Sequence, residues 1–241
     1  MNRSLLLGAV ALVGAATLGA QLDAAPATKA APARRAVAPA RDWTRTVVMT
    51  PEGGFRMGNP AARVKLVEYG SLTCGHCAAF AQQGEAPLKA YVRRGTVSYE
   101  FRNYVLNGID VTATLLARCS GPTGFFPMIH RLYTTQNQWV GRISGLSEAQ
   151  KQALSALPER QRLTRLAQVG GLTQVAALHG VTPARASQCL VDHAGIERLN
   201  QIGEAASALG VGGTPTFFIN GANIGTHTWS TLEPILRESA G

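Results

Sequence analysis

Two cysteines separated by two residues give this sequence its clearest chemical signal, in the motif Cys74-Gly75-His76-Cys77. A strand-like apolar segment, 63–69, ends shortly before the motif, and a helical segment from Cys74 to about Arg93 begins with it. The unpaired backbone N–H groups and the positive dipole end of a helix N-terminus favour thiolate over thiol. We therefore expect a lowered pKa for Cys74, with His76 as a positive or hydrogen-bonding neighbour. The motif predicts a dithiol that forms and breaks a disulfide.

The same residues could instead hold a metal ion, because two thiols and an imidazole are suitable ligands for copper or zinc. A zinc ribbon, however, needs a second ligand pair at a suitable spacing. The remaining cysteines are solitary, and the other histidines are scattered without ligand spacing: Cys119, Cys189, His130, His179, His193 and His227. We therefore predict redox chemistry without a metal or other cofactor, and keep a periplasmic copper- or zinc-binding protein as the alternative.

The segments around the motif predict one sheet-based α/β domain over residues 43–241. Strands are expected at 44–49, 63–69, 96–102, 216–219 and 222–225, and a closing helix at 229–238. Asn220-Gly221 is a strong signal for a tight turn between the last two strands. Residues 111–209 carry almost no strand signal and read as successive helices, including 125–138 as one helix and a capped helix from Ser147. The order predicts a helical insertion at about 111–209.

A second motif lies far downstream, where Gly212-Gly213-Thr214-Pro215 precedes the apolar strand 216–219. Together with the strand 64–69 and the dithiol motif, it resembles the DsbA-like thioredoxin superfamily over roughly residues 43–241. The resemblance implies a thioredoxin-like fold with a large helical insertion and the activity of a protein dithiol:disulfide oxidoreductase. It also implies a cis Thr214–Pro215 bond packed against the catalytic cysteines, with Thr214 and Pro215 binding the substrate chain as an added strand.

Glu68 lies six residues before Cys74, where the same family places a buried acid beneath the active site. The resemblance implies that this acid helps to move the proton of Cys77. Independently, a carboxyl on a buried strand should have a raised pKa and could act as a base. The alternative is an exposed glutamate at the end of a strand.

The dipeptide between the cysteines departs from the family pattern. Gly75-His76 stands where strongly oxidising DsbA proteins usually carry Pro-His, and Gly-His is the dipeptide of eukaryotic protein disulfide isomerases. This difference leaves the redox potential of the pair undetermined by the sequence, but the class of reaction is unaffected.

Cys119 and Cys189 are expected to form a second, structural disulfide. Both lie in helix-like segments with apolar neighbours, Leu115 and Leu116 near one and Leu190 next to the other. We therefore expect them to face the same interior. Two independent buried thiols are the alternative.

The N-terminal residues predict export. Arg3 precedes an uncharged run over 5–20, the pattern of a secretory signal peptide, so 1–25 is predicted to be a signal peptide or a retained membrane anchor. Residues 26–42 are rich in Ala and Pro and predict a linker. Four cysteines, an even number, agree with an oxidising compartment such as the periplasm.

Composition excludes two other classes of protein. Apolar residues make up 46% and charged residues 15% of the chain, which argues against wholesale disorder. Of the formal net charge of +9, residues 1–45 contribute +4, and no dense Lys/Arg run with interleaved aromatics is present. Nucleic acid is therefore not an expected partner.

The expected function is that of a monomeric, exported oxidase that gives its Cys74–Cys77 disulfide to reduced or unfolded exported proteins. A membrane redox partner would then reoxidise the dithiol. An isomerase or reductase of the same fold is the close alternative. Known isomerases of this group carry an oligomerisation domain before the catalytic one, and 26–42 is too short and too Pro-rich to supply it, which favours the oxidase.

Overall fold

The computed structural model describes residues 41–240. The predicted signal peptide or anchor at 1–25 lies outside the described residues, as does nearly all of the predicted linker. Among the residues that are described, no helix is long and apolar enough to cross a membrane.

A six-stranded mixed sheet forms the centre of the described region, with the strand order β1-β2-β4-β3-β5-β6. The strands are β1 Val47–Met49, β2 Phe55–Met57, β3 Val64–Gly70, β4 Val97–Asn103, β5 Thr216–Ile219 and β6 Ala222–Gly225. β3 and β4 are parallel, and the other neighbouring pairs are antiparallel. β3 thus lies in the interior of the sheet, and six of its seven residues are buried or half-buried, as expected for a strand covered on both faces.

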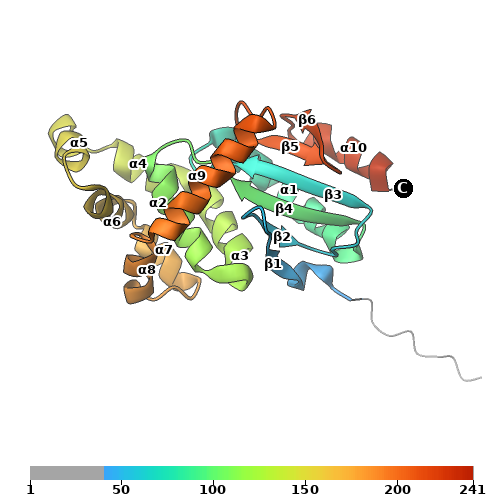
Figure 1. Cartoon of the computed structure of the whole chain (residues 1–241), viewed down its shortest axis with the longest axis horizontal. Helices are drawn as coiled ribbons and strands as arrows, with labels where there is room; N and C mark the ends of the chain where they lie inside the picture. The colour runs from blue at the N-terminus through green and yellow to red at the C-terminus, as the bar shows by residue number, and fades with distance from the viewer. Residues whose placement is uncertain (1–40, 241) are drawn as a thin grey trace, which may run out of the picture. The chain divides into compact units, whose positions relative to one another are not determined.

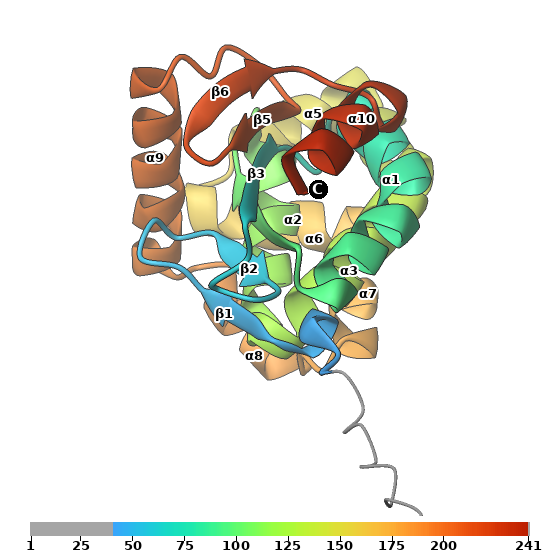
Figure 2. The same cartoon turned by 90° about the vertical axis from the view of Figure 1, so that its right-hand side faces the viewer.

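Helices cover both faces of this sheet. The helices are α1 Gly75–Arg94, α2 Gly108–Cys119, α3 Gly121–Thr134, α4 Gln136–Ser144, α5 Glu148–Ser155, α6 Glu159–Gly170, α7 Leu172–Leu178, α8 Pro183–Cys189, α9 His193–Ala208 and α10 Trp229–Ala240. Figure 2 shows α1 and α10 on one side of the sheet and α9 on the other. The helices α2 to α8 gather beyond one end of the sheet (Figure 1). The predicted α/β fold with a helical region inserted between β4 and β5 is confirmed.

The start of the domain differs from the prediction. The segment expected as one strand at 44–49 divides into a 3-10 turn at Trp43–Arg45 and the short strand β1. The strand β2 was not predicted at all, although it pairs with both β1 and β4. Its three residues are too few to show the alternation of apolar and polar side chains that marks a strand. The strand is therefore recognisable only from its pairing with β1 and β4.

The helical region also contains a break that the sequence did not predict. Residues 125–138, expected as one helix, belong to α3 and α4, which are separated at Thr135 with a non-helical backbone (φ −113°, ψ 15°). The predicted helix start at Ser147 is confirmed, because its side chain and that of Gln150 form a reciprocal capping box.

Aromatic packing joins the sheet to the inserted helices. Phe125 is fully buried and stacks on Phe55 of β2, with the ring centroids 3.9 Å apart. Phe126 is buried as well and packs against Tyr99 of β4. Residues of the sheet and of the inserted helices therefore belong to one hydrophobic core, and the helical region packs directly against the sheet.

Candidate active site

Cys74 lies at the N-cap of α1, directly after the turn that follows β3. Its backbone is extended (φ −81°, ψ 121°), and its sulfur accepts the backbone N–H of Cys77 at 3.4 Å. An N-cap side chain usually accepts such a bond through oxygen, to satisfy one of the unpaired donors of the first helical turn. Here the sulfur takes that place, so the end of the helix points its N–H groups at the atom that reacts.

The two cysteines, both free thiols in this structure, have opposite environments. Cys74 is half-buried, and its pKa falls to about 5, chiefly because the Cys77 side chain hydrogen-bonds to its sulfur, while the backbone N–H groups of Cys77 and His76 lower it further. Cys77 is fully buried, and burial raises the pKa of its thiol far above the ordinary value. Cys74 therefore has the properties of a nucleophile, and Cys77 those of a protected second thiol.

The downstream motif meets the dithiol directly. Thr214–Pro215 is a cis peptide bond, and the carbonyl oxygen of Thr214 lies 3.2 Å from Sγ of Cys74, which donates to it as a thiol. Thr216, the first residue of β5, hydrogen-bonds back to the carbonyl of Gly213 at 2.8 Å. The antiparallel pairing of β5 with β3 thus brings together two motifs 140 residues apart.

Glu68 is buried on β3, so the alternative of an exposed glutamate is wrong. Its side chain is 1% exposed and accepts a hydrogen bond from the Tyr99 hydroxyl at 2.6 Å. Burial raises the pKa of Glu68 to about 8, although the bond from Tyr99 opposes the shift. The negative charge of Glu68 also helps to raise the pKa of Cys77. A carboxyl that stays protonated near neutral pH therefore lies within electrostatic reach of the buried thiol.

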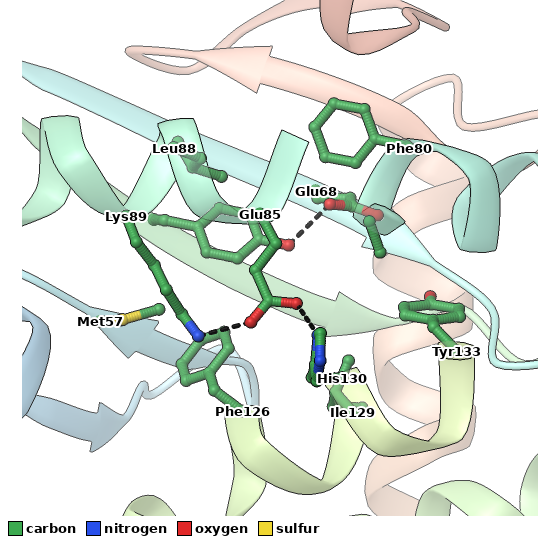
Figure 3. Close-up of a pocket in the computed structure, with 12 residues that line it drawn as sticks. Met57, Glu68, Phe80, Glu85, Leu88, Lys89, Phe126, Ile129, His130 and Tyr133 are labelled. Carbon is green, nitrogen blue, oxygen red and sulfur yellow. Dashed lines mark hydrogen bonds and ion pairs between the residues drawn. The ribbon is translucent and has the colours of Figure 1, made fainter. Parts of the chain in front are cut away.

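A small cavity opens beside Glu68, between α1, α3 and the sheet. Its volume of about 30 Å³ is enough for a water molecule, and mostly apolar side chains line it. Figure 3 shows Glu85 at this cavity, bonded to both Lys89 and His130. His130, which the sequence left as a scattered histidine, is thus the partner of the Glu85 carboxylate.

His76 is exposed beside a larger groove of about 450 Å³. Phe80 and Pro215 line the groove on the side of the dithiol, and His227 and Thr228 line it on the side of α10. The groove thus joins the exposed part of the dithiol motif to the cis-proline. Within residues 41–240, the dithiol motif included, the structure brings together no group of three or more His, Cys, Asp or Glu side chains that could hold a metal ion.

Sequence reasoning missed three buried residues that contact the turn before Cys74: Asp110 of α2, Tyr133 of α3 and Gln136 of α4. Asp110 accepts hydrogen bonds from the Ser71 hydroxyl at 2.6 Å and from the Leu72 N–H at 3.0 Å. Burial raises the pKa of Asp110 to about 6, against the effect of these bonds. The residues lie far along the chain from the turn and in no recognisable motif, so no local signal could have found them.

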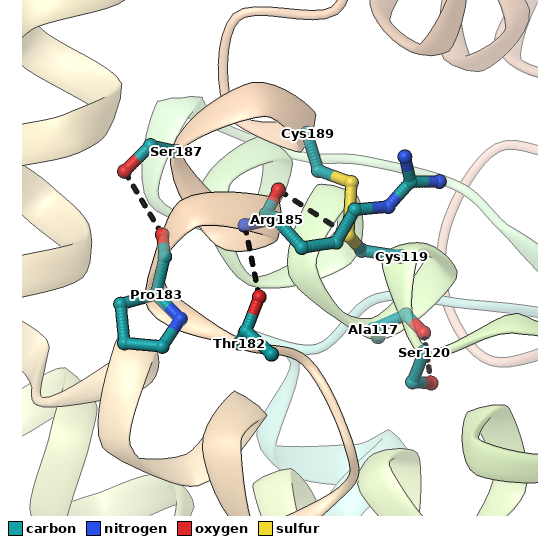
Figure 4. The surroundings of a disulfide bond; sticks show 8 residues. All are labelled: Ala117, Cys119, Ser120, Thr182, Pro183, Arg185, Ser187 and Cys189. Atoms are coloured by element: carbon teal, nitrogen blue, oxygen red, sulfur yellow. Dashed lines mark hydrogen bonds between the residues drawn. A yellow bond between two sulfur atoms is a disulfide. The ribbon is translucent and has the colours of Figure 1, made fainter.

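Cys119 and Cys189 are joined by a disulfide between the C-terminal ends of α2 and α8 (Figure 4). Their Cα atoms lie 6.0 Å apart, and the bridge closes a separation of 70 residues. Both cysteines are half-buried, and Cys119 packs against the main hydrophobic core.

A helix capped by a reactive thiol, a second buried thiol and a facing cis-proline define a redox site of the thioredoxin type. A family model described as Thioredoxin matches residues 50–238. The chain belongs to this family, with a DsbA-like arrangement of the sheet and the inserted helices. The predicted fold class and family resemblance are confirmed.

Individual proteins agree with this assignment. The structure of a protein-disulfide isomerase from Novosphingobium aromaticivorans is 33% identical, with a TM-score of 0.72 over 77% of this chain and 96% of that one. The fold is also similar to Wolbachia pipientis α-DsbA1, with a TM-score of 0.64 at 21% identity over 80% of this chain and 92% of that one. A Rickettsia conorii protein provisionally named a protein-disulfide oxidoreductase is 30% identical over 73% of this chain. The chain spans 56% of that relative's length.

The lowered pKa of Cys74 predicts rapid alkylation of the reduced protein even in mild acid. The rate with iodoacetamide should rise with pH through a midpoint near 5, because the thiolate is the reacting form. Peptide mass spectrometry should locate the label on Cys74, and Cys74→Ser should abolish the rapid reaction. A midpoint near the ordinary thiol value of about 8.5, or a label on Cys77, would contradict the assignment.

Glu68→Gln should stabilise the reduced protein near neutral pH. The folded-state pKa is raised from 4.5 to about 8, so the stability of the wild type is fully present below pH 4.5 and is lost as the pH rises toward 8. The variant lacks this loss, which is worth about 1.4 kcal/mol for each unit of pKa shift. Urea melts should therefore coincide near pH 4 and diverge by a few kcal/mol at pH 8. Glu148→Gln, at an exposed position, is the control. Equal stability of the wild type and Glu68→Gln at pH 8 would show that ionisation of Glu68 does not destabilise the folded protein.

Removal of the second disulfide should reduce stability without removing the active dithiol. The closed loop of 70 residues gives an upper limit of about 4 kcal/mol from chain entropy. The double variant Cys119→Ala/Cys189→Ala should lower the free energy of unfolding by up to this amount in denaturant melts. Thiol counting supplies the control: mild reduction of the wild type should expose two thiols, and four would show that the bridge is as labile as the active site.

Proposed function

We propose that this protein is an exported thiol–disulfide oxidoreductase that donates a Cys74–Cys77 disulfide to reduced, folding proteins. The observation that carries the proposal is the asymmetry of the pair: a half-buried thiol with a pKa of about 5 at the end of a helix, and a fully buried thiol with a raised pKa. Such a pair directs attack to one sulfur and protects the other.

The proposed reaction has two exchange steps. A substrate thiolate attacks Sγ of Cys74 in the disulfide form, the Cys74–Cys77 bond breaks, and its electron pair passes to the sulfur of Cys77. That sulfur takes up a proton, which the protonated Glu68 can supply. A second substrate thiolate then attacks the substrate sulfur of the mixed disulfide and releases Cys74 as a thiolate. The substrate gains one disulfide, and the enzyme is left as the dithiol.

The direction of transfer follows from which redox state the site stabilises. The helix N-terminus and the Cys77 side chain stabilise the Cys74 thiolate, which exists only in the reduced form. The disulfide carries no charge that these groups could stabilise. The reduced enzyme is therefore favoured, and its disulfide is a good oxidant. Gly75 in place of proline favours a weaker bias than that of the strongest oxidants, so we expect a potential between about −120 and −230 mV.

Substrate binding is proposed at the cis-proline and the adjoining groove. Thr214 and Pro215 would pair with an extended substrate chain as an added strand, and the groove beside His76 would receive its side chains. The protein would act as a monomer in the periplasm, after export by its N-terminal segment, and a membrane redox partner would reoxidise it.

An isomerase is the second candidate for the same site. The 33% identical protein from N. aromaticivorans is named a protein-disulfide isomerase, and Gly75-His76 matches the dipeptide of eukaryotic isomerases. The oxidase and the isomerase would use the same dithiol. The redox potential distinguishes both of them from a reductase, and assays with reduced or with wrongly paired substrate proteins distinguish them from each other.

Paired melts of the reduced and oxidised protein test the direction. The folded-state pKa of Cys74 is depressed, so the stability that its thiolate adds is fully present above the ordinary thiol pKa and is lost as the pH falls through 5. With allowance for solvent screening of a half-exposed group, the reduced form should be more stable by roughly 1 to 2.5 kcal/mol at pH 7. The difference should vanish near pH 4. A reduced form that melts earlier at pH 7, with a potential near −270 mV, would make the protein a reductase instead.

A further inference from the structure

The turn that delivers Cys74 to α1 has backbone and hydroxyl groups that take side-chain partners from outside the turn, in addition to the local bonds from the Cys74 N–H to the Ser71 carbonyl and from the Ala78 N–H to the Cys74 carbonyl. Buried carbonyl and N–H groups require partners, because each one left unpaired costs free energy. In the turn 71–74, these groups include the carbonyls of Ser71, Leu72 and Cys74 and the N–H of Leu72. Their side-chain partners all come from the inserted helical region.

Each of three inserted helices contributes one buried side chain to this turn. Asp110 of α2 accepts from Ser71 and Leu72, as described above. The hydroxyl of Tyr133 on α3 donates to the carbonyl of Ser71 at 3.1 Å. Gln136, the first residue of α4, reaches furthest toward the reacting cysteine.

The Gln136 amide donates two hydrogen bonds to the turn. Its Nε2 lies 2.8 Å from the carbonyl oxygen of Leu72 and 3.0 Å from that of Cys74. A side-chain amide nitrogen carries two N–H donors, so both are used. Gln136 is 8% exposed, and an open hollow of about 190 Å³, lined also by Gly75 and Ala78, lies beside it.

The hydrogen bond from Gln136 to the carbonyl of Cys74 acts on the N-cap residue, whose backbone conformation determines where the reactive sulfur points. The carbonyl of Cys74 also accepts the N–H of Ala78 at 3.1 Å, in the first turn of α1. Gln136 therefore holds the carbonyl of the N-cap residue from outside the helix, while its sulfur accepts the N–H of Cys77. Without Gln136, this carbonyl would keep only the bond from Ala78, and the N-cap conformation that aims the sulfur at the helix donors would be less firmly held.

We propose that Gln136 is a positioning residue for the redox reaction: it holds Cys74 in the N-cap conformation that stabilises its thiolate, and so lets the inserted region set the redox equilibrium. The inference rests on the proposed function. Because the thiolate exists only in the reduced form, loss of Gln136 should weaken the reduced form more than the oxidised one.

Two variants and a matched control test this role. Gln136→Leu removes both donors at similar volume. Gln136→Glu keeps the shape but faces the two carbonyls with a carboxylate that cannot donate. Gln138→Leu makes the same change at an exposed position of the same helix. Each protein is equilibrated with glutathione buffers, its thiolate is titrated by ultraviolet absorbance, and both redox forms are melted in denaturant.

The expected result is an equilibrium shifted toward the disulfide form. For Gln136→Leu, the equilibrium constant for oxidation of glutathione should fall three- to tenfold, or about 15 to 30 mV by the two-electron relation. The thiolate titration should move to higher pH, and the reduced form should lose more stability than the oxidised form. Gln136→Glu should shift the equilibrium at least as far, and Gln138→Leu by less than twofold.

Equal destabilisation of both redox forms, with the potential and the thiolate titration unchanged, would overturn the proposal and leave Gln136 a purely structural residue. If Gln136→Leu does not fold, Gln136→Met, which also removes both donors without adding a charge, decides the matter by the same readouts. The test is separate from that of the proposed function: a wild-type potential near that of thioredoxin would reject the oxidant role, while the shift between wild type and variant would still test Gln136.

Discussion

The bond from the N–H of Cys77 to the sulfur of Cys74 is the interaction on which the site depends, because it makes a reactive atom the cap of a helix. A helix needs a cap in any case, since its first N–H groups have no partners within it. Here that need is met by a thiolate, so the stability of the helix end and the reactivity of the sulfur are coupled. Other parts of the structure position this residue. Strand β3 leads to it, and Gln136 of the inserted helices holds its backbone carbonyl. In the thiol form, its sulfur also donates to the Thr214 carbonyl at 3.2 Å.

Burial then divides the roles between two chemically identical residues. Cys74 and Cys77 are three positions apart, yet only the first lies at the open end of the helix. Burial that raises the pKa of Cys77 also raises that of Glu68, because both charged forms lose hydration. When the disulfide opens, the sulfur of Cys77 therefore has to take up a proton. The carboxyl of Glu68, which remains protonated near neutral pH, is a buried donor for it. The same loss of hydration thus raises the pKa of both the Glu68 carboxyl and the Cys77 thiol.

The sequence predicted what depends on neighbours along the chain and missed what depends on partners across it. Strand β3, the start of α1 and the β5–β6 hairpin at Asn220-Gly221 follow local patterns, and both turn residues have positive φ, as such turns require. Strand β2 has three residues and exists through its pairing with β4, so no local period reveals it. Tyr99 on Glu68 and Gln136 on Cys74 bridge 31 and 62 residues. Such contacts are set by packing, which a single sequence does not display.

The inserted helical region is consequently part of the site rather than an attachment to it. A thioredoxin-like sheet that carried the same dithiol motif but lacked α2, α3 and α4 would leave the turn at 71–74 with its buried carbonyls and N–H groups in need of other partners. Water could supply them only if the turn were exposed, which would also hydrate the thiolate and weaken the influence of the helix end. The insertion thus does two things at once: it excludes water from the turn and replaces the hydrogen bonds that water would have made. On this argument, the properties of Cys74 belong to the combination of sheet and insertion, and not to the four residues of the motif alone.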